Sequence, residues 1–363
     1  MPTTNRPNGV TEYTWGAKRS RKKILLIVST CLIIIAAGVG GFLYFSKGED
    51  PVSATTGNSN TAPGQATVAR VIDGVSIPQD RANLFPVGVM IENLVSARPQ
   101  SGLGDANVVY EALAEGGITR FLALFATGYE VPKIGPVRSA RSYYLDWALE
   151  YGALYAHIGG SPQALTDIKT KKVFDLNQFA YSQYFWRDTE RQRPHNLYTS
   201  SAKLALAVRD RKAPEQGNFS SWAFKAEAAL ASRPAEAKSV EIDFSSFSYK
   251  VIYDYNREKN AYMRNQAGQP HVDSEGKQIS AKNVIVQYTK ATLADGDGRL
   301  AMTTVGEGKA IIFRDGVAVQ GTWKKTSPEG RTQYLDSSGK PVELIPGTIW
   351  VEIVPTDREI VYN

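Results

Sequence analysis

The chain has 363 residues, 42% of them hydrophobic and 10% aromatic, and this composition excludes a wholly disordered protein. Its formal net charge of +6 would indicate a nucleic-acid-binding protein only if the basic residues covered a folded surface. Residues 1–23 hold six basic residues against one acidic residue, so the remainder is nearly neutral. We therefore expect a basic N-terminal tail and no nucleic-acid partner.

Residues 24–45 follow this tail and carry no charge. A run of this length can cross the hydrocarbon core of a bilayer as a helix. Because the basic residues precede it, the positive-inside rule places residues 46–363 outside the cytoplasm. We predict a signal-anchor in the cell membrane, with a cytoplasmic N-terminus and an extracytoplasmic domain. A cleaved signal peptide is the alternative, but the apolar run is longer than such peptides need and no small-x-small site closes it.

Cys31 is the only cysteine and lies inside this apolar run. No disulfide can form within the chain, so the exported part must be stabilised by core packing. The residue before it, Thr30, is bulky where a lipidation site has a small residue. We therefore interpret Cys31 as a small side chain buried in the membrane.

Three segments follow the anchor. Residues 46–82 are rich in Ser, Thr, Gly, Asn and Pro, and are expected to be a flexible linker. Residues 83–215 alternate between strand and helix patterns. The elements expected there are a strand at 84–93, a hairpin with strands at 107–113 and 118–126, a helix capped by Ser139, a strand at 153–158, a helix at 162–170 capped by Ser161, and a helix from 201.

The C-terminal part has a different pattern. Residues 216–239 form a Pro-bearing, alanine-rich connection, and residues 240–363 contain strands and tight turns without a notable helix. We expect a mostly antiparallel sheet or barrel there. The predicted fold class is thus α+β: an N-terminal transmembrane helix, a mixed α/β first domain and a mostly antiparallel β second domain.

Several long motifs occur together: PVGVMIEN, ARPQSGL, VVYEALAEGGITRFLALF, KIGPVRSARSYYLDWALEYGALYAHIGGSPQA, RPHNLYTS and GTIWVEIVP. In combination they resemble the YerB-like family of bacterial lipoproteins. The resemblance covers roughly residues 83–360, and it implies an exported, membrane-tethered protein with two domains and an unassigned activity. The chain departs from the lipoprotein pattern because it lacks a convincing lipobox.

Common catalytic signatures are missing from the sequence. There is no Walker A loop, no GxSxG, no HExxH and no complete EF-hand. The exported part contains no cysteine, and the whole chain contains three histidines, so the supply of metal ligands is small. We predict neither a cofactor nor a metal.

Arg138 and Arg141 bracket the start of the helix expected after Ser139. Helix starts usually attract acids, because their unpaired N–H groups carry partial positive charge. Two interpretations stay open. The arginines pair with Glu111 or Glu115 in a buried network, or they hold an anion at the helix start, where backbone N–H groups add donors.

His157 precedes the turn Gly159-Gly160, which leads into the helix capped by Ser161. Such a turn lets a ligand approach the backbone, although a histidine at a strand end is often only structural. If His157 and His195 face one cleft, general acid–base chemistry on an envelope polymer follows. The catalytic candidates are Glu111, His157, Asp188 and His195.

The predicted function is binding of an anionic or glycan envelope ligand by the first domain. Two alternatives stay open, a wall-polymer hydrolase or transferase and an interaction module for another membrane protein, so enzyme activity is undecided. The expected partners are the membrane, through residues 24–45, that ligand and other envelope proteins. The ligand-binding candidates are Arg120, Arg138, Ser139, Arg141, Gly159, Gly160, Ser161, Arg193 and Asn196.

Overall fold

The computed structural model describes residues 66–126, 128 and 130–363. This part contains twenty-two strands and three α-helices, so the fold is mostly β and the predicted mixed α/β first domain is wrong. The helices are short: α2 (Ser142–Leu149), α3 (Pro162–Thr170) and α4 (Ser201–Asp210). No helix in the described part is long and apolar enough to cross a membrane. The structure thus gives the transmembrane prediction no support, and residues 24–45 lie outside the described residues.

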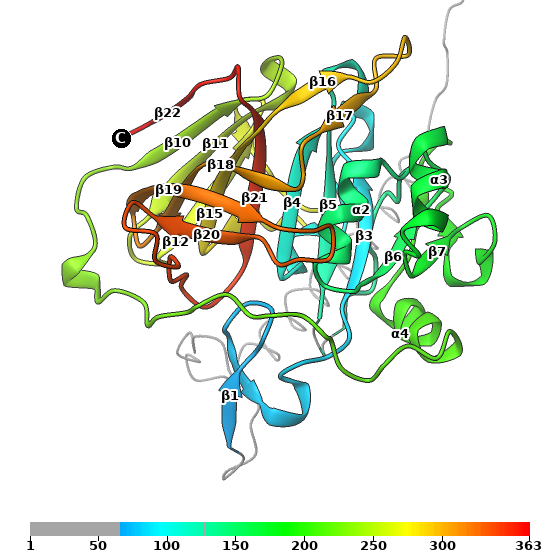
Figure 1. The fold of residues 1–363 in the computed structure, drawn as a ribbon, viewed down its shortest axis with the longest axis horizontal. Helices are drawn as coiled ribbons and strands as arrows, with labels where there is room; N and C mark the ends of the chain where they lie inside the picture. Colours follow the sequence, from blue (N-terminus) through cyan, green and yellow to red (C-terminus); the bar gives the residue numbers. More distant parts are fainter. Residues whose placement is uncertain (1–65, 127, 129) are drawn as a thin grey trace, which may run out of the picture. The chain divides into compact units, whose positions relative to one another are not determined.

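A ten-stranded mixed sheet forms the centre of the described part (Figure 1). In spatial order its strands are β20 (Gln333–Asp336), β19 (Val317–Lys325), β18 (Gly306–Arg314), β15 (Asn283–Thr289), β21 (Ile349–Pro355), β4 (Val108–Leu113), β5 (Thr119–Phe125), β3 (Val87–Glu92), β6 (Leu154–His157) and β7 (Asp175–Asn177). Strand β21 pairs in parallel with both β15 and β4. One sheet therefore contains strands from both predicted domains.

In a smaller six-stranded sheet, all the strand pairs are antiparallel. Its strands are β13 (Gln269–Pro270), β12 (Ala261–Gln266), β11 (Lys250–Asn256), β10 (Ser239–Asp243) and β22 (Ile360–Tyr362), with β14 (Ser280–Ala281) beside β12. Three two-stranded ribbons complete the fold: β1 (Thr67–Ala69) with β2 (Ser76–Pro78), β8 (Trp186–Arg187) with β9 (Leu197–Tyr198), and β16 (Ala291–Leu293) with β17 (Leu300–Met302). Residues 240–363 thus form open sheets, and two of their strands, β15 and β21, pair in parallel.

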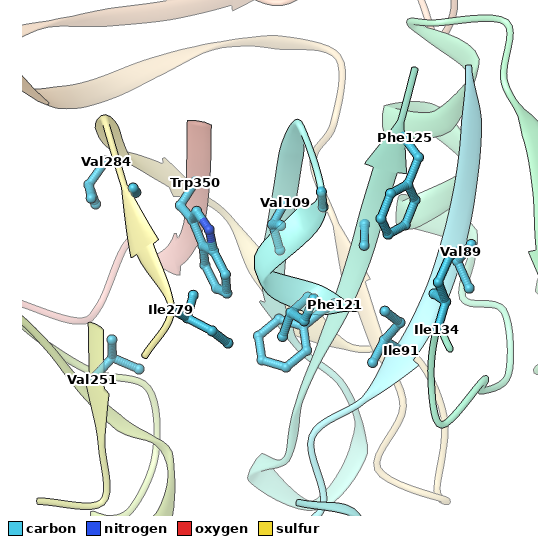
Figure 2. Packing of buried hydrophobic residues seen from close by; sticks show 14 of the residues in the cluster. Val89, Ile91, Val109, Phe121, Phe125, Ile134, Val251, Ile279, Val284 and Trp350 are labelled. Atoms are coloured by element: carbon cyan, nitrogen blue, oxygen red, sulfur yellow. The ribbon is translucent and has the colours of Figure 1, made fainter. Parts of the chain in front are cut away.

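Both faces of the large sheet are buried, as strand β5 illustrates. Phe121 and Phe125 point into one core, whereas Leu122 and Leu124 point into the other, because successive side chains of a strand alternate between faces. The first core is closed by the smaller sheet and α4, and the second by α2 and α3. Figure 2 shows the first core. There the rings of Phe121 and Trp350 pack edge to face, with their centroids 5.7 Å apart.

The expected hairpin is present as β4 and β5, which pair antiparallel across a tight turn at Glu115–Gly117. Gly116 and Gly117 have φ of 66° and 73°, a region that glycine adopts without strain. The strands expected at 84–93 and 153–158 are also confirmed as β3 and β6. Helix α3 begins after Ser161 as predicted, because the Ser161 hydroxyl accepts the N–H of Ala164.

Ser139 does not cap a helix, contrary to the prediction. Helix α2 begins at Ser142, with Arg141 in the N-cap position and no side-chain cap. The backbone before it stays extended, because Ala140 exchanges hydrogen bonds with the turn at Gly159 and Ser161.

Folded structure also begins earlier than expected, inside the predicted linker 46–82. The ribbon of β1 and β2 starts at Thr67, and Ile72 is buried in the second core. Arg70 and Asp73, both buried, form an ion pair at 2.7 Å. The part of the linker from Arg70 to Asp73 is therefore packed against the protein, whereas β1 itself is exposed.

Candidate functional site

Glu92, at the C-terminal end of β3, joins two of the predicted site residues. One oxygen of its carboxylate lies 2.9 Å from Arg138 Nε, and the other lies 2.7 Å from His195 Nδ1. The Glu92 side chain is 5% exposed. A buried carboxylate therefore orients one arginine and one histidine at the same place. We call Glu92, Arg138 and His195 the Glu92 site.

Backbone pairing brings Arg138 to the end of β3. The N–H of Glu92 donates to the carbonyl of Pro136, and the N–H of Arg138 donates to the carbonyl of Met90. The segment before α2 thus continues the sheet beside β3. His195 arrives on a loop that Arg191 holds in place by donating to backbone carbonyls at Ala97 and Pro99.

The outer atoms of the Glu92 site are accessible. The side chains of Arg138 and His195 are 24% and 18% exposed. Within the described residues, no protein group bonds to the terminal guanidinium nitrogens of Arg138 or to Nε2 of His195. The Arg138 nitrogens can therefore donate to a ligand, and Nε2 of His195 is open to a hydrogen bond whose direction depends on the ring tautomer, while the Glu92 carboxylate orients both side chains.

Arg141 and Arg120 instead bind Glu115, one of the two carboxylates proposed from the sequence. Arg141 Nε donates to Glu115 at 2.8 Å, and Arg141 Nη1 donates to the carbonyl of Ala140. Arg120 donates to the carbonyl of Ser139 and contacts Glu115 at 3.4 Å. Burial tends to raise the pKa of Glu115, but the bond from Arg141 and the two positive charges outweigh it and lower that pKa to about 2.

The starts of α2 and α3 line a common cavity of about 330 Å³, together with Arg141 and Arg299. Two helix starts favour an anion, and α2 has no side-chain cap. The charges are compensated, however. Arg141 faces Glu115, and Arg299 pairs with Asp295 and Asp297 at 2.8 Å each. The arginines of this cavity are thus held by neighbouring carboxylates, whereas the Glu92 site combines an arginine with an accessible histidine on one carboxylate.

Backbone N–H groups of the glycine turn before α3 are already hydrogen-bonded within the protein. Gly159 donates to Asn177 Oδ1 at 3.1 Å, and Ser161 donates to the carbonyl of Ala140 at 3.2 Å. Gly160 bridges to Ala140. The turn therefore fastens the segment before α2 to the end of β6, and it offers few free donors.

His157 is completely buried on β6, and both ring nitrogens are occupied. Nδ1 lies 2.6 Å from the carbonyl oxygen of Gly159, and Nε2 lies 2.5 Å from Asp175 Oδ1. No hydrogen bond or ion pair joins it to His195 within the described residues. The geometry assigns His157 a structural position, and it separates the two histidines that the sequence had grouped.

Asp188 and Asn196 stabilise the loop that carries His195. Asp188 forms an ion pair with Lys133, whose hydrogen bond lowers the pKa of that carboxyl group. Asn196 donates to the carbonyl of Asp188 and accepts from Arg187. Arg193 is exposed in the same loop. Asp188 therefore contacts neither His157 nor His195 through an interaction of the described residues.

Glu111 is completely buried between the two sheets. It accepts hydrogen bonds from Arg264, Thr119 and Asn93, and Arg264 is also fully buried. Phe121, Tyr253 and Trp350 surround the guanidinium group of Arg264. Glu111 is therefore part of an internal ion pair, out of reach of a ligand at the Glu92 site.

Sequence reasoning did not select Glu92. The residue ends an apolar run, VGVMIE, and is followed by the polar Asn93, which is the pattern of a strand end that carries a functional group. Its partners, Arg138 and His195, are distant from it in the chain. The sequence alone therefore did not indicate which carboxylate they share.

Residues 73–214 match the domain described as "Protein of unknown function (DUF3048) N-terminal domain", and residues 240–351 match the corresponding C-terminal domain. The chain is 32% identical over 290 residues to "Putative lipoprotein YerB" of Bacillus subtilis (strain 168), covering 78% of this chain and 85% of that protein. It is also similar to the crystal structure of the YerB protein from Bacillus subtilis. That comparison has a TM-score of 0.73 and 29% identity, over 82% of this chain and 99% of the other.

Proposed function

Because the chain belongs to the YerB-like DUF3048 family, as its motifs predicted, we propose that it is an extracytoplasmic protein of the bacterial envelope that binds an anionic ligand at the Glu92 site. Its location rests on the relative, whose printed name describes a lipoprotein and so a protein attached to a membrane. Its ligand chemistry rests on the site.

A single observation supports the ligand class: Glu92 holds Arg138 and His195 together and leaves their outer nitrogens free. The site thus offers the guanidinium fork of Arg138 beside an accessible histidine ring. Arginine presents its donors in a fork that matches the oxygens of phosphate and carboxylate groups. The preferred ligand is therefore an envelope polymer that carries such groups.

The same geometry supports a second candidate, hydrolysis of that polymer. A carboxylate at Nδ1 of a histidine fixes the ring and leaves Nε2 free to take a proton, which is the arrangement found in catalytic triads. Here the nucleophile would be water, because no serine, threonine or cysteine side chain is hydrogen-bonded to the His195 ring within the described residues.

The test compares binding and cleavage. The purified full-length chain is immobilised, and we measure retention of a phosphate-bearing wall polymer against a neutral glucan of similar length, together with released fragments. The proposal predicts retention of the anionic polymer only, with retention falling as salt is raised. Arg138→Gln and His195→Gln should each weaken retention about tenfold or more, since hydrogen bonds to charged groups are worth about 1.5–3 kcal/mol.

Arg209→Gln is the matched control, because Arg209 is an exposed cation whose only ion pair in the described residues is with the adjacent Asp210. If Arg209→Gln weakens polymer retention as much as Arg138→Gln does, the loss reflects general surface charge and not the Glu92 site. Equal retention of the neutral glucan would refute the anionic ligand. Fragments that disappear in His195→Gln would establish the hydrolase, and retention without fragments would leave binding as the function.

A further inference from the structure

A separate cleft of about 520 Å³ has walls from both of the larger sheets. Strands β15, β18 and β19 of the ten-stranded sheet line it, together with β22 of the six-stranded sheet and the turn between β21 and β22. None of the Glu92 site residues contributes to its walls. Pockets that hold small organic ligands have volumes of roughly 300–1,000 Å³, so a ligand of that kind fits here.

Three cations line this cleft from three separate segments. Lys290 directly follows β15, Lys309 lies on β18, and Arg358 lies in the turn after β21, where its N–H donates to the carbonyl of Pro355. All three side chains belong to exposed residues, so a ligand can reach them. In the part of the chain that the structure describes, none of them forms an ion pair or a side-chain hydrogen bond. Their donors are therefore available to an anion.

Two carboxylates, Glu307 and Glu359, line the same cleft and are exposed as well. Neither pairs with a cation of the described residues. Because the cations outnumber the carboxylates, the cleft favours a ligand with negative charge. Ionised carboxylates only accept hydrogen bonds, so the same ligand should also carry donors such as hydroxyl groups.

Aromatic side chains form another part of the wall. Nζ of Lys309 lies 5.1 Å from the centroid of the Tyr288 ring, and the Trp323 indole donates to the Tyr288 carbonyl at 2.8 Å. Tyr362 is half-buried, and its ring packs edge to face on Phe313 with the centroids 5.2 Å apart. Tyrosine combines an apolar ring with a polar tip, which suits a ligand that has both an apolar face and hydroxyl groups.

We propose that this cleft binds a sugar ring that carries an acidic group, as uronic acids and sugar phosphates do. The acidic group accepts hydrogen bonds from the three cations, the sugar hydroxyls donate to the two carboxylates, and the ring lies against Tyr362. One molecule of this class pairs both kinds of unpaired charge in the cleft. The site is independent of the Glu92 site, since the two share no residue.

The experiment is calorimetric titration of the full-length chain with four probes: glucuronate, glucose 6-phosphate, glucose and inorganic phosphate. At least one of the two acidic sugars should bind at least tenfold more tightly than glucose, which lacks the anion, and than inorganic phosphate, which lacks the ring. The tighter of the two shows whether the acidic group is a carboxylate or a phosphate. If glucose or inorganic phosphate binds as tightly as both acidic sugars, or if no probe binds, the proposal fails.

Lys309→Gln and Arg358→Gln assign the binding to this cleft. Both side chains are exposed and lack ion pairs among the described residues, so each variant should keep the thermal unfolding midpoint and weaken binding of the acidic sugar at least fivefold. Lys169→Gln is the matched control, because Lys169 is an exposed lysine on α3 outside the cleft, and it should change binding less than twofold. Unchanged binding in both cleft variants would overturn the assignment, and so would a loss in Lys169→Gln as large as theirs.

Discussion

Glu111 and Glu352 lie opposite each other on the neighbouring parallel strands β4 and β21, and both side chains are completely buried. A single cation, Arg264, bonds to Glu111. The hydroxyl of Tyr253 donates to one oxygen of Glu352, and the other oxygen has no partner in the described residues. Burial, followed by the adjacent carboxylate of Glu111, raises the pKa of Glu352 well above its usual value, against the opposing charge of Arg264.

Glu352→Gln should therefore stabilise the protein at neutral pH. A carboxyl group whose folded-state pKa is raised loses stability as the pH rises above its unfolded value near 4.5, because only the unfolded state ionises freely there. Glutamine resembles the protonated acid and removes this loss. Urea unfolding between pH 5 and pH 8 should show a falling unfolding free energy in the wild type and a flatter profile in the variant. A variant less stable than the wild type at pH 8 would contradict a protonated Glu352.

Arg264→Met should destabilise the protein by about 3–5 kcal/mol, because it leaves the buried Glu111 carboxylate without its cation. The double variant Arg264→Met with Glu111→Gln removes both charges and should recover a large part of that free energy. Denaturant unfolding of the two single variants and the double variant measures the coupling. Additive losses would mean that the pair contributes no specific interaction.

Glu115 should make the protein sensitive to acid. Its pKa is lowered from 4.5 to about 2, so its stabilising contribution is present above pH 4.5 and is lost as the pH falls from 4.5 toward 2. The Glu115 side chain is 33% exposed, so solvent screening reduces the size of the effect. Unfolding midpoints of the wild type and Glu115→Gln should converge over this interval. Parallel curves would refute the pairing with Arg141.

Much of the local structure could be predicted from the sequence. Strand β3, the hairpin β4–β5 and helix α3 follow from apolar alternation, glycine turns and the Ser161 cap. The fold class could not be predicted from the sequence, because it depends on the pairing of β21 with β4. Those strands are more than two hundred residues apart in the chain, and no local pattern specifies such a partner.

The sequence indicated which types of residue form the candidate site, but it did not indicate which of them lie together. Arg138 and His195 were selected because they lie in polar connections, and the structure brings them to one carboxylate. That carboxylate, Glu92, was missed, since it ends an otherwise apolar strand. His157 was grouped with His195 because both are histidines near turns, but its two nitrogens bind local groups at the end of β6.

His157→Gln separates structure from binding. We expect a loss of about 1–3 kcal/mol in unfolding free energy, because at least one of the hydrogen bonds from the buried position 157 to the partly buried Gly159 and Asp175 is lost. Retention of the phosphate-bearing wall polymer should stay within twofold of the wild type under conditions where the variant is folded. A variant of unchanged stability that no longer retains the polymer would place His157 in the binding site.

The measurement that tests the central claim most directly is a double-mutant cycle for Arg138→Gln and His195→Gln, read out as the dissociation constant of the phosphate-bearing polymer. If Glu92 orients both side chains toward one anion, each single variant should weaken binding about tenfold or more, or about 1.4 kcal/mol. The double variant should lose less than the sum, because neighbouring residues that share a ligand couple. Binding that is unchanged in all three variants would contradict the account.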